Sequence, residues 1–245
     1  MNAETEIKNR TEFVKDILNK SNAKGIVYGN SGGKDSALVG ILCKMACDNT
    51  TGIIMPCSSK RNYSEDMQDG LKVAKKFGIR TITVDLTPVK DAFTKQLSDI
   101  FKLTQSASSN INPRLRMVTL YSYAASNGCL VAGTGNASEA YMGYFTKWGD
   151  GAHDFNPIGD LHVSEIYELL EYLGAPKSII TKAPSAGLKE GQTDEGEMGV
   201  SYKQIESYIL NGPDSVNEKA RAIIERMHAA SEHKRRAIPV YKKYE

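Results

Sequence analysis

A chain of 245 residues is long enough to bury a substantial core, and 24% charged with 40% hydrophobic residues is typical of a globular protein. The formal net charge of +2 gives no indication of nucleic-acid binding, and no apolar run is long enough to span a bilayer. Because the first residues do not resemble a signal peptide, we expect a cytoplasmic protein with no nucleic-acid or membrane partner.

Apolar periodicity predicts helices that alternate with short strands through the first half of the chain. Helices are expected over residues 4–20, 37–48, 64–77, 89–103 and 114–125. Strands are expected over residues 25–28, 51–56, 79–84 and 129–132. This alternation predicts an α/β fold with a parallel sheet flanked by helices on both faces, in which ligands bind beyond the carboxyl ends of the strands.

The pattern changes after residue 150. Helices are expected over 163–173, 202–210 and 215–230, followed by a basic tail. The stretch 183–199 is rich in glycine and charge and is either a lid over the site or an ordinary surface loop. We expect residues 1–245 to form a single domain, with an α/β core over about 21–160 and a lid and helical extension over about 161–245.

The four cysteines do not form a metal-binding pattern. Cys43 and Cys47 are four residues apart on a predicted helix, but neither belongs to a Cys-x-x-Cys pair or has a histidine partner. We therefore interpret them, like Cys57 and Cys129, as small apolar residues.

The most informative segment lies between the first strand and the following helix. It consists of Gly29, Asn30, Ser31, Gly32, Gly33, Lys34, Asp35 and Ser36. A glycine-rich turn that leads into a helix brings unpaired backbone N–H groups and the positive end of the helix dipole to an anion. A carboxylate beside bound phosphates needs an intervening cation, so Asp35 indicates Mg²⁺.

The segment differs from the two common phosphate-binding motifs. A Walker A loop would have serine or threonine after Lys34 and glycine in place of Tyr28, and the dinucleotide-binding glycine spacing is absent. The segment resembles the Ser-Gly-Gly-x-Asp-Ser loop of the PP-loop ATP pyrophosphatases. This resemblance implies a Rossmann-like, adenine nucleotide alpha hydrolase-like fold and cleavage of ATP between its α and β phosphates.

Further motifs narrow the resemblance. They lie at residues 133–139, 143–151, 154–161 and 184–195 and at the pair His233 and Lys234. In this order and spacing they are similar to those of the ammonia-dependent NAD⁺ synthetases. That resemblance implies a ligase that uses ATP to adenylate the carboxylate of deamido-NAD⁺ (nicotinic acid adenine dinucleotide), with release of pyrophosphate. Ammonia then displaces AMP to give NAD⁺.

The resemblance also implies roles for individual residues. ATP would be bound by the loop from Gly29 to Ser36 together with Thr134 and Ser185. Mg²⁺ would be bound by Asp35 and Glu139. The residues implied for deamido-NAD⁺ are Arg114, Lys147, Asp154, His233 and Lys234.

Two positions depart from the family pattern. Val163 stands where many relatives have a lysine that contacts ATP, so that role is not transferred to it. Lys34 occupies a position that is often uncharged, and it either adds a phosphate contact or points to solvent.

The remaining expectations concern nitrogen supply and assembly. About two dozen residues precede the first strand, too few for a glutaminase domain, so free ammonia is the expected nitrogen donor. The family implies a homodimer, with the first helix and the helix from Arg114 as candidate contacts. The alternatives are another PP-loop adenylating enzyme that acts on a nucleotide or tRNA, and a non-catalytic nucleotide sensor.

Overall fold

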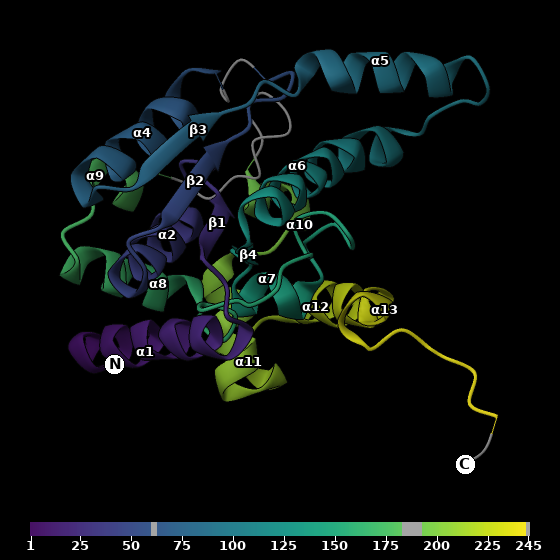
Figure 1. The fold of residues 1–245 in the computed structure, drawn as a ribbon. Coiled ribbons are helices and arrows are strands. Elements are labelled where there is room, and N and C mark those ends of the chain that lie inside the picture. Colours follow the sequence, from purple (N-terminus) through teal and green to yellow (C-terminus); the bar gives the residue numbers. More distant parts are fainter. Residues whose placement is uncertain (60–62, 183–192, 244–245) are drawn as a thin grey trace.

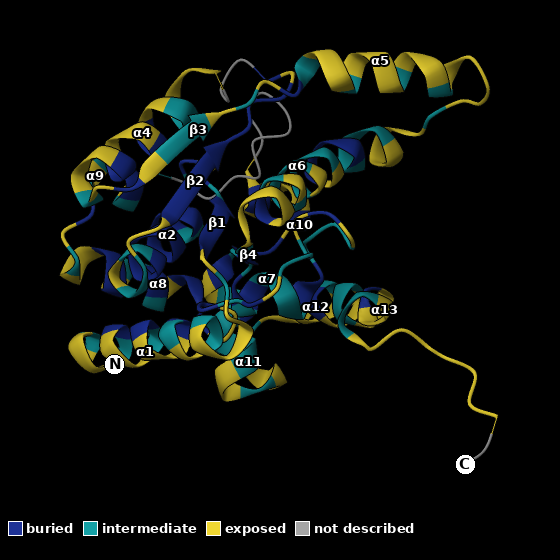
Figure 2. Ribbon diagram, in the orientation of Figure 1, coloured by how far each residue is buried: buried dark blue, intermediate teal, exposed yellow. Residues whose placement is uncertain are grey.

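The computed structural model describes residues 1–59, 63–182 and 193–243. Its centre is a parallel four-stranded sheet with the order β3-β2-β1-β4 (Figure 1). The strands are β1 (Gly25–Gly29), β2 (Thr50–Ile54), β3 (Arg80–Thr83) and β4 (Cys129–Ala132). The two central strands, β1 and β2, are almost wholly buried, as their lack of polar alternation predicts (Figure 2). The expected parallel sheet and its four strands are confirmed.

One face of the sheet is covered by α2 (Lys34–Ala46), which packs against α1 (Ala3–Ser21), α4 (Glu65–Phe77) and α8 (Val163–Tyr172). Asn2 caps α1, because its side chain accepts a hydrogen bond from the Thr5 amide. Ile7 and Val14 of α1 are buried in the main core. The apolar stripe of the first helix therefore faces the core.

The other face is covered by α6 (Gln105–Asn127), with α5 (Thr87–Ser98) packed on it. Two expected boundaries were wrong here. The helix expected from Arg114 begins at Gln105 and continues through Pro113, since Thr104 caps it and the buried segment around Asn112 holds its first half in place. The helix expected over 89–103 runs over α5 instead, with Pro88 in its first turn.

A second group of helices follows the sheet. It comprises α7 (Ala137–Met142), α9 (Lys177–Ile180), α10 (Asp194–Met198), α11 (Tyr202–Asn211), a 3₁₀ turn (Pro213–Ser215), α12 (Glu218–Ala230) and α13 (Glu232–Arg235). A buried cluster that includes Met142, Tyr202, Ile205 and Ile224 joins α7, α11 and α12. Of residues 183–199, for which a lid or a surface loop is expected, residues 193–199 are described and contain the short helix α10, whereas residues 183–192 lie outside the described residues.

A search of the described ranges for membrane-spanning segments finds no helix that is both long and apolar enough to cross a bilayer.

Candidate active site

The phosphate loop connects the carboxyl end of β1 to the first turn of α2. The residue at the N-cap of α2 is Gly33, which has no side chain to satisfy the first helical N–H groups, so this helix start is available to an anion. Ser31 and Ser36 lie with their hydroxyl oxygens 3.1 Å apart, and Ser36 also donates to the Gly33 carbonyl at 3.0 Å. The loop therefore offers backbone amides and two hydroxyl groups in one place.

Gly32 has a backbone conformation and a neighbour that exclude a side chain. Its φ is +72°, and a Cβ atom there would lie 2.0 Å from the Asp66 carbonyl oxygen of α4. Asn30 strengthens the same contact, since its side-chain amide donates to the Gly70 carbonyl at 3.0 Å. The shape of the phosphate loop thus depends on direct packing against α4.

The turn after β4 brings the second acidic residue to the loop. Asn136 and Glu139 form a capping box at the start of α7, with the Asn136 amide donating to Glu139 Oε2 at 3.1 Å. The Asn136 side chain also donates to Asp35 Oδ1 at 3.1 Å. The carboxyl ends of β1 and β4 therefore meet in one crevice, as the parallel sheet predicts.

The two carboxylates influence each other strongly. Burial and the negative charge of Asp35 raise the pKa of Glu139 to about 8. Lys34 is buried and donates from Nζ to Asp35 Oδ2 at 2.8 Å, so its side chain does not point to solvent. Burial alone would lower the pKa of Lys34, but the charges of Asp35 and Glu139 raise it. The site thus holds two buried carboxylates close together, and a cation bound with the phosphates would reduce the repulsion between them.

Asp35 and Glu139 supply the carboxylate oxygens that Mg²⁺ prefers, but they would need phosphate oxygens to complete the site. Mg²⁺ is usually bound in nucleotide sites by one or two carboxylates together with phosphate oxygens and water. In the described ranges, no group of three or more histidine, cysteine, aspartate or glutamate side chains is arranged to hold a metal alone. Asp35 and Glu139 would therefore hold Mg²⁺ together with the nucleotide.

A cavity of about 1130 Å³ connects this region to the loop that follows α7. This volume slightly exceeds the roughly 300–1,000 Å³ typical of sites for one drug-sized ligand, so there is room for more than one substrate. One end is lined by the phosphate loop, Thr134 and Glu139, and the other by residues 143–146 and 149–153 and by Lys234.

The residues implied for deamido-NAD⁺ divide into two groups. Arg114 donates to the Lys147 carbonyl at 3.3 Å, Lys147 Nζ donates to the His233 carbonyl at 2.6 Å, and Lys234 Nζ donates to the Gly143 and Phe145 carbonyls at 2.7 and 2.6 Å. Of these four only Lys234 lines the cavity, and the others lie beside it.

Asp154 is separate from these four residues, because its hydrogen bonds are to β4 and α6. It accepts a hydrogen bond from the Val131 amide at 2.8 Å and another from the Tyr121 hydroxyl at 3.2 Å. These contacts fasten the segment after the cavity loop to β4, and Asp154 does not line the cavity.

Val163 and Ser185 are the remaining positions considered for ATP binding. Val163 is buried in the cluster that joins the C-terminal helices, so it is removed from the cavity, as its apolar side chain predicts. Ser185, like residues 183–192 as a whole, lies outside the described residues.

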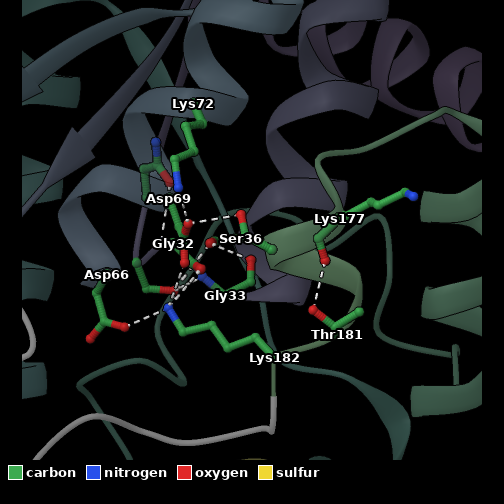
Figure 3. Close-up of polar contacts among 12 residues, drawn as sticks. Gly32, Gly33, Ser36, Asp66, Asp69, Lys72, Lys177, Thr181 and Lys182 are labelled. Carbon is green, nitrogen blue, oxygen red and sulfur yellow. Dashed lines mark hydrogen bonds and ion pairs between the residues drawn. The ribbon is translucent and has the colours of Figure 1, made fainter.

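The residues that line the cavity without an assigned role include Arg116, Asp194 and Lys182. Arg116 donates from Nε to the Met55 carbonyl at 3.3 Å, and burial lowers its pKa. Asp194 accepts a hydrogen bond from the Tyr202 hydroxyl at 3.1 Å. Lys182 reaches the phosphate loop from the end of α9 (Figure 3). Asp194 lies within the motif at residues 184–195, and Arg116 lies two residues after Arg114, whereas Lys182 had no signal in the sequence.

Comparisons with known proteins agree with this geometry. A family model described as NAD synthase matches residues 6–238. An NH₃-dependent NAD⁺ synthetase from Carboxydothermus hydrogenoformans is 44% identical over 239 residues, which are 96% of each chain. A solved NMN synthetase from Francisella tularensis has a TM-score of 0.92 and 37% identity, with full coverage of both chains.

A solved NH₃-dependent NAD synthetase from Campylobacter jejuni has a TM-score of 0.82 and 29% identity, covering 99% of this chain and 100% of that one. These likenesses confirm the adenine nucleotide alpha hydrolase-like fold expected from the phosphate loop. With a family model that spans nearly all of its residues and a curated relative at 44% identity, the chain belongs to the NAD synthase family.

Proposed function

We propose that the cavity between the phosphate loop and Lys234 is where this chain performs the family reaction. That reaction is the ATP-dependent amidation of deamido-NAD⁺ to NAD⁺ with ammonia. The observation that carries the assignment is the meeting of Asp35 and Glu139 at the uncapped start of α2, within a cavity large enough for a second substrate.

The reaction makes a poor electrophile reactive. An oxygen of the nicotinate carboxylate attacks the α-phosphorus of ATP, the bond to the bridging oxygen breaks, and pyrophosphate leaves. Ammonia then attacks the carboxyl carbon, loses a proton, and AMP leaves with the oxygen that the carboxylate supplied. The protein needs to position the two substrates, stabilise the developing charge and exclude water.

At the nucleotide end, the amides at the start of α2 and the hydroxyls of Ser31 and Ser36 would bind the phosphates, and Thr134 would contact ATP from the end of β4. Asp35 and Glu139 would hold Mg²⁺, which neutralises the charge of the leaving pyrophosphate. Ser185 is retained as an ATP contact from the family resemblance alone. Lys34 keeps the Asp35 carboxylate oriented through its 2.8 Å ion pair.

At the other end, Lys234 is the cation among the residues implied for deamido-NAD⁺ that lines the cavity, so it would bind the phosphates or carboxylate of this substrate. Lys147, Arg114 and His233 are retained as contributors from its rim. Asp154 is better explained by its hydrogen bonds to Val131 and Tyr121, so its proposed role is to hold the loop that binds the substrate.

The enzyme is further proposed to act as a homodimer. The structure describes every residue of α5 and buries none of them, and Val89 and Phe93 on it are 52% and 44% exposed, as is Val118 on the adjoining α6 at 53% (Figure 2). Apolar side chains on adjoining helices are typical of a subunit interface. Ile7 and Val14 of α1 are buried in the core, but Phe13 of α1 is 44% exposed, so α1 stays a candidate contact beside α5 and α6.

We also propose that the enzyme acts in the cytoplasm. All four cysteines are free thiols, which is typical of a reducing compartment.

A direct assay tests the activity. The purified protein is mixed with ATP, Mg²⁺, deamido-NAD⁺ and an ammonium salt, and NAD⁺ is followed with a coupled dehydrogenase. One parallel reaction replaces ammonium by glutamine. Another replaces deamido-NAD⁺ by nicotinic acid mononucleotide, because one solved neighbour is an NMN synthetase, and is followed by pyrophosphate release and product analysis. We expect NAD⁺ with ammonium and none with glutamine. Efficient turnover of the mononucleotide with none of the dinucleotide would overturn the substrate assignment.

A further inference from the structure

Lys182 links three segments at the nucleotide end of the cavity. Its ammonium group donates to Asp66 Oδ1 at 2.7 Å, to Asp69 Oδ2 at 3.1 Å and to the Gly32 carbonyl at 3.5 Å (Figure 3). The side chains of Lys182, Asp66 and Asp69 are only 15%, 12% and 8% exposed. Lys182 and Asp66 both line the cavity.

The two acidic residues are close to where a polyanion is expected. Both belong to the first turns of α4, and the Asp66 carbonyl lies against Gly32 of the phosphate loop. Burial alone would raise the pKa of Asp69, but hydrogen bonds from Ser178, Lys182 and Lys72 hold this pKa below its usual value, so Asp69 is charged. Negative charge at this position opposes the binding of a triphosphate unless a cation compensates it.

Two lysines contact Asp69, and their positions differ. Lys72 pairs with Asp69 Oδ1 at 3.1 Å, but its side chain is 55% exposed and does not line the cavity. Solvent screening weakens the field of such an exposed charge. Lys182 is the enclosed cation of the pair, and it is also the one that contacts the phosphate loop.

We propose that Lys182 is a positioning residue of the ATP site. By neutralising Asp66 and Asp69 it keeps the wall formed by α4 from repelling the phosphates, and it holds Gly32 against that wall. This inference rests on the proposed function, because it assumes that ATP binds at the phosphate loop.

The test compares variants that remove the charge of Lys182 with variants that keep this charge or remove the charge of Lys72. Lys182→Met removes the ammonium group and keeps most of the side-chain length, whereas Lys72→Met removes the exposed partner of the same carboxylate. The double variant Lys182→Met/Asp66→Asn removes one charge of each sign, and Lys182→Arg keeps the cation. For each variant, ATP binding with Mg²⁺ is measured calorimetrically without deamido-NAD⁺, and the KM values for ATP and deamido-NAD⁺ are determined separately.

Lys182→Met is expected to weaken ATP binding and raise the KM for ATP on the order of tenfold, with little change in the KM for deamido-NAD⁺. Lys72→Met and Lys182→Arg should remain close to wild type, and the double variant should recover most of the lost ATP affinity. Recovery in the double variant would also show that the loss in Lys182→Met is not caused by misfolding.

Three results would overturn the inference: unchanged ATP binding in Lys182→Met, an equal rise of both KM values, or no recovery in the double variant. Failure of the wild-type protein to bind ATP would instead overturn the proposed function, and the inference with it. Binding by the wild type and equal binding by Lys182→Met would overturn the inference alone.

Discussion

At the scale of single residues, the site is defined by two carboxylates that follow neighbouring strands, β1 and β4, at the carboxyl edge of the sheet. Asp35 begins the helix after β1, Glu139 lies in the first turn of α7, and Asn136 contacts both. In the absence of a cation these charges repel each other, which adds to the effect of burial in raising the pKa of Glu139 to about 8. Because the two carboxylates repel each other, the pair lowers the stability of the metal-free protein, and binding of a metal would remove this repulsion.

This conflict predicts opposite effects of Glu139→Gln on activity and on stability. Formation of the adenylate should be abolished in Glu139→Gln and in Asp35→Asn, measured as pyrophosphate release. Full turnover of either variant would show that its carboxylate does not hold the metal.

The stability effect has a defined pH dependence. The pKa of Glu139 in the folded state, about 8, lies above the usual 4.5, so its contribution to stability is complete below about pH 4.5 and is lost as the pH rises to about 8. The Glu139→Gln variant carries no ionisable group at this position. Without metal or nucleotide, its free energy of unfolding should therefore exceed that of wild type by about 4 kcal/mol at pH 8.5 and by only about 1 kcal/mol at pH 5. Urea denaturation measures this, and a difference independent of pH would contradict the explanation.

A second residue-scale prediction concerns Lys147. Lys147 directly follows Thr146, which lines the cavity, and its ammonium group donates to the His233 carbonyl of α13. Lys147→Ala should raise the KM for deamido-NAD⁺ roughly tenfold, with a much smaller effect on ATP, because one charged hydrogen-bonding group is lost at that end of the cavity. Steady-state kinetics of Lys219→Ala, an exposed lysine on α12, provide the control. Equal effects on both substrates would argue against the assignment.

At the scale of elements, the contact between the phosphate loop and α4 determines the shape of the nucleotide site. Gly32→Ala should destabilise the protein by about 2 kcal/mol or more, because it combines a positive φ with a Cβ that would meet the Asp66 carbonyl. Gly78 has a similar φ of +65° with no atom within 4 Å of a Cβ, so Gly78→Ala isolates the conformational cost. Urea denaturation of the two variants should show a clearly larger loss for Gly32→Ala, and equal losses would contradict the packing argument.

Helices α5 and α6 carry the prediction about assembly. Light scattering after size-exclusion chromatography should give twice the 26.9 kDa chain mass for wild type. Phe93→Asp should shift the mass toward that of a single chain, since it places a charge within the apolar surface of α5. Leu210→Asp, at a 67% exposed position on α11, should leave the dimer intact. A monomeric wild-type protein would rule out the homodimer.

At the scale of the whole molecule, the sequence predicted the features that depend on local pattern. The buried strand followed by a glycine-rich turn predicted both β1 and the start of α2, and the parallel alternation predicted that the β1 and β4 ends would converge. Local pattern was insufficient at Pro113, because the penalty of proline within a helix is overcome by tertiary packing that the sequence does not display.

The same limit applies to the site. The role of Lys182 depends on contacts with Asp66 and Asp69, which belong to α4, so no local motif marks it. The substrate contact implied for Asp154 stays a prediction, and the sequence did not show its hydrogen bonds to β4 and α6. The domain division near residue 160 stays a prediction.

The central claim is that the cavity activates a carboxylate by transferring AMP to it, and isotope transfer tests this most directly. Deamido-NAD⁺ labelled with ¹⁸O in the nicotinate carboxylate is incubated with the enzyme, ATP, Mg²⁺ and ammonium, and the AMP is analysed by mass spectrometry. We expect one ¹⁸O atom in the phosphate of AMP for each NAD⁺ formed. NAD⁺ formation with unlabelled AMP, or with ADP and phosphate as products, would contradict it.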